Sequence, residues 1–141
     1  MRPMQYYPLI QTEDVVGTSS FYQRHFGFRP MFESDWYVHL QSVAEPSVNL
    51  AVLKHDHETI PAEARGVTQG VILTFEVEDV DAEDARLRAE GVSVVSKLRS
   101  EDHGQRHAIY RDPNGIMIDV ITPIPPAPEF QADYAAEALP A

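Results

Sequence analysis

Residues 111–123 read RDPNGIMIDVITP, which predicts a tight turn followed by a β-strand. The proline presets φ for the first central position of a turn, and the Asn-Gly pair tolerates the left-handed backbone angles that reverse a chain. Residues 107–110 lead into this turn and residues 116–121 lead out of it. The whole stretch therefore predicts a β-hairpin.

The outgoing strand alternates, so its two faces differ in chemistry. Ile118 and Val120 point to one side, and Met117, Asp119 and Ile121 point to the other. Asp119 is the only charged residue in an otherwise apolar strand. Its side chain therefore lies either in water at a sheet edge or in a cavity.

Length and composition exclude several classes of protein. The 141 residues suffice for one domain or for two small modules that share a core. No cysteine is present, so disulfides, thiolate zinc sites and cysteine nucleophiles are excluded. A formal net charge of -11 argues against nucleic-acid and anionic-membrane partners, and it is compatible with a cationic ligand or simply with solubility. The N-terminus lacks a signal-peptide core and no apolar run nears membrane-spanning length, so a cytoplasmic location is expected.

The two halves of the chain follow the same pattern. Each opens with a strand-like run, residues 6–12 and 71–77, followed by Glu-Asp-Val and a predicted helix. The helices end near Gly27 and Gly91, and glycine is a natural helix C-cap. The second helix, residues 81–90, has an acidic first turn and arginines later, an order that suits the helix dipole.

Three further strand-like runs follow each glycine. The order strand–helix–strand–strand–strand therefore occurs twice, offset by about 65 residues, which is too long for a solenoid unit and indicates a duplicated module. The expected organisation is a single domain over residues 1–123, with modules at about 5–53 and 70–122 and a polar linker at 54–69. Residues 124–141 form a Pro/Ala-rich C-terminal arm, expected to be loose apart from a helical turn at 134–139. The strand-like runs are 28–32, 36–41, 48–53, 92–97, 106–110 and 116–121.

Together these features resemble the vicinal oxygen chelate superfamily, which includes glyoxalase I, the extradiol dioxygenases, fosfomycin resistance enzymes and bleomycin-resistance proteins. The resemblance covers about residues 5–123. It rests on the paired modules, on an Asp-Val step before each helix, and on three motifs. The motifs are Phe21-Tyr22 in the first helix, Gly27-Phe28 after it, and Asp112-Pro113-Asn114-Gly115 before the last strand. They indicate the fold and not one chemistry, because the superfamily spans several reactions.

The resemblance implies an α+β fold in which two paired βαβββ modules form a half-open mixed sheet around a cavity, with the helices on the convex side. Catalytic members hold a divalent metal in this cavity through His, Gln or Glu side chains. Carried onto this sequence, the ligand positions are Tyr7, Ala51, Ile72 and Asp119. Ala51 and Ile72 offer no donor atom. We therefore expect the customary metal site to be absent and the protein to use no cofactor.

The aromatic stretch at residues 32–41 indicates where a small molecule binds. It resembles the matching stretch of bleomycin-resistance proteins, which lack metal ligands and hold their drug in a groove between subunits. Rings stack on planar or cationic ligands and acidic residues complement positive charge, so the expected ligand is planar and cationic. Within this cavity, strand alternation turns either Trp36 or Tyr37 away. Alternatively, both residues fill the core or a dimer interface. The residues expected to line the cavity are Tyr7, Trp36, Tyr37, His39, Glu76, His107 and Asp119.

Histidines suggest two other kinds of site. His107 and Asp119 are the candidates for catalysis, because a histidine–carboxylate pair in an apolar pocket can act as a general acid or base. His55 and His57 could form a surface metal clip, although such a cluster is more often a solvated linker. No nucleophile motif, phosphate loop or dinucleotide fingerprint occurs in the chain.

Two classes of function stay open from the sequence. The first is a metal-independent protein that binds a small molecule such as an antibiotic. The second is a lyase, isomerase or dioxygenase of the same superfamily, with an unusual metal site or the His107–Asp119 pair. The missing donors at Ala51 and Ile72 favour the first. Family members complete their half-open sheets by pairing modules, so a homodimer with two equivalent clefts is expected.

Overall fold

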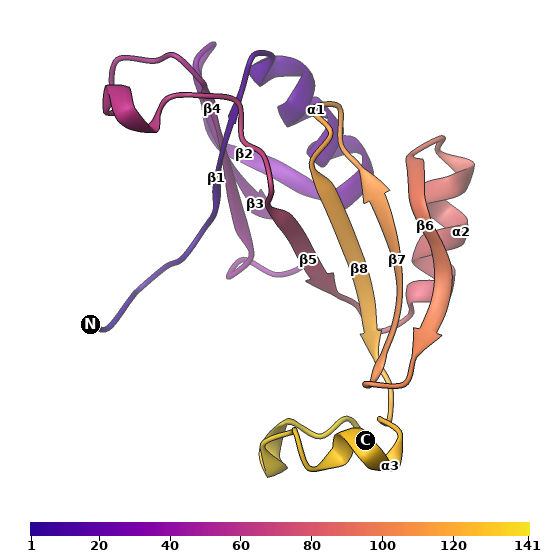
Figure 1. Cartoon of the computed structure of the whole chain (residues 1–141). Helices are drawn as coiled ribbons and strands as arrows, with labels where there is room; N and C mark the ends of the chain where they lie inside the picture. The colour runs from indigo at the N-terminus through magenta and orange to yellow at the C-terminus, as the bar shows by residue number, and fades with distance from the viewer. The chain divides into compact units, whose positions relative to one another are not determined.

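The structure is a computed structural model that describes residues 1–141 (Figure 1). By its contacts the chain divides into two compact units, residues 1–70 and 71–141. The elements of the first unit are β1 (Leu9–Thr12), α1 (Val15–Phe26), β2 (Phe28–Glu33), β3 (Tyr37–Ser42), β4 (Asn49–Lys54) and the 3-10 helix η1 (Ala62–Ala64). The elements of the second are β5 (Ile72–Glu76), α2 (Val80–Ala89), β6 (Ser93–Glu101), β7 (Gln105–Arg111), β8 (Met117–Pro123), α3 (Pro128–Gln131) and the 3-10 helix η2 (Ala136–Ala138).

Both units have the same sheet topology. The strand order is β1-β4-β3-β2 in the first unit and β5-β8-β7-β6 in the second. In each unit the first strand runs parallel to the last, and the other pairs are antiparallel. Each sheet is open and mixed, and each unit carries one long helix, so the predicted α+β fold of two βαβββ modules is confirmed.

The helices begin and end where the sequence places their signals. The Asp14 carboxylate accepts a hydrogen bond from the Gly17 amide at 2.8 Å, and the Asp79 carboxylate accepts one from the Ala82 amide at 3.0 Å. These contacts satisfy amide groups that the first helical turn otherwise leaves unpaired. Gly27 ends α1 with φ of 67°, a left-handed conformation that favours glycine.

Each long helix covers one face of its own sheet with apolar side chains. Tyr22 of α1 is fully buried, as are the strand residues on the same face of the first sheet. In the second unit Ile118 and Val120 of β8 are buried with Leu87 of α2, so the predicted alternation of β8 is confirmed. Each fully buried side chain of this size contributes about 1.5–3 kcal/mol relative to exposure. The strand residues buried on the helix-covered face of the first sheet are Ile10, Val38, Leu40, Leu50 and Val52.

The turn at residues 112–115 forms as predicted and places β8 inside the sheet. The Gly115 amide donates to the Asp112 carbonyl at 3.1 Å, and Gly115 has φ of 86°. The Asp112 side chain accepts from the amides of Asn114 at 2.7 Å and Ile116 at 2.9 Å. Because β8 lies between β5 and β7, Asp119 is not at a sheet edge.

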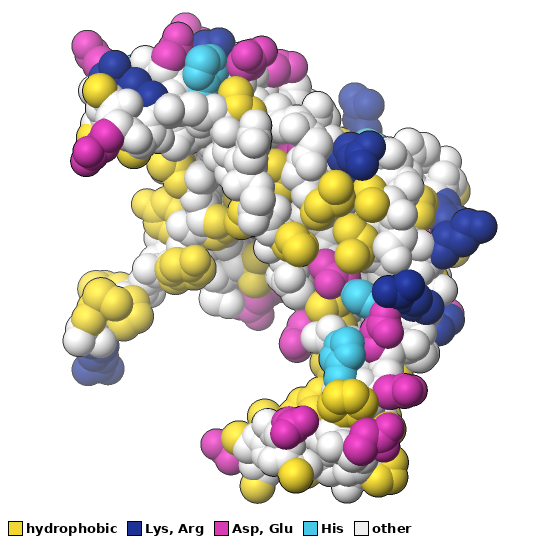
Figure 2. All heavy atoms as spheres, viewed as in Figure 1, with side chains coloured by type: hydrophobic (Ala, Val, Ile, Leu, Met, Phe, Trp, Pro, Cys, Tyr) yellow, Lys and Arg dark blue, Asp and Glu magenta, His cyan; other side chains and the backbone are white.

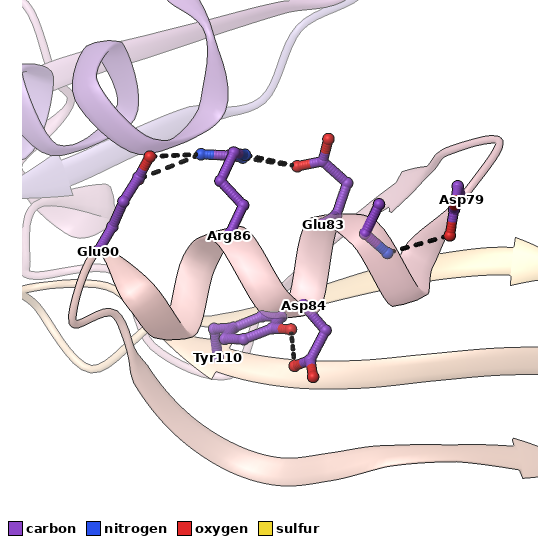
Figure 3. A network of polar contacts seen from close by, with 7 residues as sticks. Asp79, Glu83, Asp84, Arg86, Glu90 and Tyr110 are labelled. Carbon is purple, nitrogen blue, oxygen red and sulfur yellow. Dashed lines mark hydrogen bonds and ion pairs between the residues drawn. The ribbon is translucent and has the colours of Figure 1, made fainter.

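A polar network fastens α2 within the second unit (Figure 3). On the outer side of the helix, Arg86 bonds Glu83 and Glu90. On the inner side, the Tyr110 hydroxyl of β7 donates to the Asp84 carboxylate at 2.5 Å, and both side chains are buried. Burial, reinforced by the Asp84 carboxylate, raises the pKa of Tyr110 above its ordinary value.

The C-terminal arm differs from the expected loose segment. It contains the short helices α3 and η2, and η2 lies within the predicted 134–139 turn. Its amides and one tyrosine hydroxyl bond the turn between β6 and β7. The proline-rich composition correctly indicates little regular structure, but it carries no signal for these contacts, which join residues far apart in sequence.

None of the helices is both long and apolar enough to cross a membrane.

Candidate functional site

The open face of the first sheet, away from α1, carries a band of rings and amides. Alternation along β3 puts Tyr37, His39 and Gln41 on this face. Their register partners on β4 are Leu53, Ala51 and Asn49, in that order, and Leu9 of β1 lies beside Ala51.

An apolar groove of about 400 Å³ lies on this face at its junction with the linker. Trp36 and Tyr37 both line it. The prediction that strand alternation turns one of them away from the cavity does not apply, because β3 begins at Tyr37 and Trp36 precedes the strand. No charged side chain lines the groove, which therefore suits an uncharged, flat part of a ligand. The lining residues are Leu9, Trp36, Tyr37, Leu53, Thr59, Ile60 and Pro61.

The sequence did not predict the contact between His57 and Trp36, one of the residues that line the groove. Its ring stacks on the Trp36 ring, with 3.9 Å between centroids and 7° between planes. His57 Nδ1 accepts from the Thr59 amide at 3.3 Å and lies 2.9 Å from the Thr59 hydroxyl, and these contacts orient the ring. His57 is thus engaged with an aromatic ring and is not arranged as half of a metal clip with His55. In the sequence, the only signal for this contact is that His57 is an aromatic ring in a polar linker.

A second hollow of about 340 Å³ follows the same face toward β2. His39 Nε2 lies 3.0 Å from Asn49 Oδ1, and the Tyr7 ring meets the His39 ring edge-on at 4.6 Å. Burial, together with Tyr7 nearby, raises the pKa of Tyr37, so this hydroxyl stays neutral at physiological pH. Four of the predicted cavity residues, Tyr7, Trp36, Tyr37 and His39, therefore gather in the first unit.

The open face of the second sheet carries charge in place of rings. His107 of β7 is bonded at both ring nitrogens: Nδ1 lies 2.9 Å from Asp119 Oδ1, and Nε2 lies 3.1 Å from Glu101 Oε1. Arg99 Nε donates to the same Glu101 oxygen at 2.5 Å. Glu76 lies on the same face of the sheet and is exposed. Sequence reasoning had paired His107 with Asp119 but missed Glu101, which adjoins a turn and shows no motif.

This arrangement favours the doubly protonated imidazole. Carboxylates only accept hydrogen bonds, so two carboxylate partners require a proton on each ring nitrogen. Burial by itself lowers the pKa of His107, but the bonds to Glu101 and Asp119 outweigh it, and the pKa is raised above its ordinary value. The bond from His107, followed by that from Arg99, lowers the pKa of Glu101. Two cations and two carboxylates thus balance within this cluster.

The residues at the superfamily's metal-ligand positions do not fit a metal. Ala51 is buried and Ile72 is 55% exposed, and neither has a donor atom. A protonated His107 has no lone pair to offer, and it occupies one oxygen of Asp119. No group of three or more His, Asp and Glu side chains is arranged to hold a metal ion.

The acidic side chains are dispersed over the surface. On the face seen in Figure 2 they lie over several elements, including the C-terminal arm, and do not form one continuous patch. The net charge of -11 thus gives a general attraction for cations.

Comparison with known proteins agrees with the fold and the repeated module. Residues 6–120 match the model of the Glyoxalase/Bleomycin resistance protein/Dioxygenase superfamily, and the chain belongs to this superfamily. No curated protein sequence matches the chain.

Solved structures at low sequence identity share the fold. TioX from Micromonospora sp. ML1 has a TM-score of 0.71 at 20% identity, covering 86% of this chain and 100% of its own. A lactoylglutathione lyase from Agrobacterium tumefaciens has a TM-score of 0.68 at 17% identity, covering 86% and 96%. A glyoxalase/bleomycin resistance protein/dioxygenase from Nocardioides has a TM-score of 0.72 at 20% identity, covering 88% and 85%.

Proposed function

We propose that this protein is a metal-independent binding protein for a planar small molecule. The groove beside Trp36 carries the proposal, because it offers ring faces and aliphatic walls and no acid or base. The absence of donor atoms at Ala51 and Ile72 supports binding over metal-assisted catalysis. An antibiotic with a flat ring system is one ligand of this kind, and a cytoplasmic protein that sequesters it would give resistance.

The open faces of the two units differ in the chemistry that they offer a ligand. The first unit supplies Trp36, Tyr37 and His39 for stacking. The second unit supplies carboxylates, of which Glu76 is exposed while Asp119 is bonded to His107. Glu76 is therefore the better partner for a positive charge on the ligand, and Asp119 acts in company with His107. Rings in the first unit and exposed carboxylate in the second each favour a planar cation.

A second candidate function is a lyase or isomerase reaction that uses His107. The imidazole lies between two carboxylates and its pKa is raised, so it keeps its proton to higher pH than an ordinary histidine and can donate it as a general acid. It can act as a base only after giving up a bond to Glu101 or Asp119. This restriction places the catalytic candidate behind ligand binding.

The preference for ligand charge can be measured with three flat compounds of similar size that are positive, neutral and negative. We expect a planar cation to quench Trp36 fluorescence saturably at micromolar concentration, a neutral analogue more weakly, and an aromatic sulfonate least. Trp36 is the only tryptophan, so the signal reports this groove. Glu76→Gln should weaken cation binding by roughly threefold to tenfold, and Asp119→Asn should also weaken it. The exposed Glu137→Gln serves as the control.

Equal affinity for cation and sulfonate, or unchanged binding in both carboxylate variants, would contradict the proposal that the protein prefers a positively charged ligand. If no aromatic compound perturbs Trp36, then its ring is structural, and the His107 reaction becomes the stronger candidate.

The proposed assembly is a two-fold homodimer with two equivalent clefts. Exposed apolar side chains on the open faces and strands support it: Leu9 is 44% exposed, Phe32 54% and Ile72 55%. Sedimentation equilibrium should give twice the chain mass of 15.9 kDa at micromolar concentration. A monomer under these conditions would contradict the assembly.

A further inference from the structure

We infer that residues 124–138 of the C-terminal arm act as a latch: they hold the turn between β6 and β7 and, through that turn, keep the Glu101 carboxylate on His107. The contacts of the arm do not depend on the proposed function. Only an effect of the latch on ligand binding rests on it. Figure 1 shows the arm, in yellow, beneath the turn where β6 and β7 meet.

Every carbonyl at the tip of the turn is bonded to the arm. The Ala127 amide donates to the Asp102 carbonyl at 2.8 Å, and the Ile124 amide donates to the Gly104 carbonyl at 3.0 Å. Between them, the Tyr134 hydroxyl donates to the His103 carbonyl at 2.5 Å. Three consecutive carbonyls are thus satisfied by one short segment, whereas the tip of a hairpin is usually left to water.

Side chains add a second set of contacts at the same place. The Phe130 ring of α3 meets the His103 ring edge-on at 6.4 Å. Gly104 is buried and has φ of 116°. A Cβ on Gly104 would lie 2.4 Å from the Tyr134 hydroxyl and 3.3 Å from Pro126 Cβ, so the close approach of the arm requires glycine here.

The turn that the arm holds begins at Glu101. The Gly104 amide donates to the Glu101 carbonyl at 3.0 Å, which closes the turn and fixes the backbone from which the Glu101 side chain extends. That side chain accepts from His107 Nε2 at 3.1 Å and from Arg99. A change in the turn therefore reaches His107 through Glu101, whose backbone belongs to the turn and whose side chain is bonded to His107.

The charged groups around His107 make this contact measurable. Glu101 and Arg99 come from β6 and Asp119 comes from β8, while Glu76 of β5 is separated from His107 by β8. Nε2 of His107 lies 3.1 Å from Glu101 and Nδ1 lies 2.9 Å from Asp119. Release of Glu101 alone should expose Nε2 to solvent and leave the contact between Nδ1 and Asp119 in place. A purely structural arm, by contrast, would change the stability of the turn and not the exposure of Nε2.

Tyr134→Phe tests the latch, because it removes one hydroxyl and keeps the ring. Tyr6→Phe is the matched control, since Tyr6 is 81% exposed. Two quantities are measured by NMR on the whole chain without ligand: the hydrogen-exchange rate of the His107 Nε2 proton, which is bonded to Glu101, and that of the Gly104 amide. In Tyr134→Phe we expect both to exchange roughly fivefold faster. Tyr6→Phe should change neither.

A second variant guards against a substitution that is too mild. Phe130→Ala combined with Tyr134→Phe removes both side-chain contacts and should produce larger changes in the same directions. An unchanged exchange rate of the His107 Nε2 proton in this double variant overturns the inference, whether or not the Gly104 amide exchanges faster. Because no ligand is present, this outcome is independent of whether the protein binds planar cations.

Discussion

Trp36→Ala is expected to bind planar aromatic compounds at least tenfold more weakly than the wild-type protein. Trp36 and Tyr37 are the two rings that line the apolar groove. An aromatic contact contributes about 0.5–1.5 kcal/mol beyond the area that it buries, and 1.4 kcal/mol corresponds to a tenfold change in affinity. Isothermal titration calorimetry is the suitable measurement, because the variant has no tryptophan left to report binding.

Two companion variants separate stacking from folding. Trp36→Phe keeps a ring in the groove and should recover most of the affinity. His57→Ala removes the ring that stacks on Trp36 and leaves the Trp36 face open to a ligand. Wild-type affinity in Trp36→Ala would show that Trp36 has a structural role only.

Asp84→Ala is expected to lower the free energy of unfolding by about 1–3 kcal/mol, because it leaves the buried Tyr110 hydroxyl without its acceptor. For a chain of this size the melting temperature should fall by roughly 5–10 °C. Tyr110→Phe should also destabilise, since it leaves the Asp84 carboxylate with only Arg88, 3.8 Å away. Thermal unfolding measured by circular dichroism, with Tyr6→Phe as the exposed control, tests both. Variants as stable as the control would contradict the role given to this pair.

The contact between Tyr110 and Asp84 also predicts how the free energy of unfolding changes at alkaline pH. The pKa of Tyr110 is raised in the folded state, so above pH 10 the unfolded chain releases this proton while the folded chain keeps it. The stabilising effect of the neutral hydroxyl is complete below pH 10 and is lost as the pH rises further. Tyr110→Phe should therefore show a smaller loss of stability between pH 9 and 11 than the wild-type protein.

The fold was predictable because its signals are local and repeated. Alternation in residues 116–121, the turn at 112–115 and an aspartate before each helix all depend on neighbours in sequence. These signals place every strand within a few residues of its observed bounds. The shared order in the two halves then gives the topology, since a duplicated module folds the same way twice.

The candidate site was only partly predictable, because its contacts join distant residues. His107 and Asp119 lie on adjacent antiparallel strands of a predicted hairpin, so their approach follows from the pattern. The stacking of His57 on Trp36 and the bond from His107 to Glu101 depend on how a loop and a turn lie against the sheet. The contacts of the C-terminal arm could not be predicted for the same reason. Proline and alanine mark a segment without a strand pattern but do not show which surface it contacts.

Metal-independent binding is tested most directly by one binding isotherm measured on the same protein before and after treatment with EDTA. The ligand is a planar cationic dye such as proflavine, and elemental analysis accompanies each sample. With Ala51 and Ile72 at the ligand positions and His107 protonated, we expect well under one divalent metal ion per chain and the same micromolar dissociation constant in both samples. Binding that disappears with EDTA and returns on adding back Fe, Mn, Ni or Zn would contradict the proposed function.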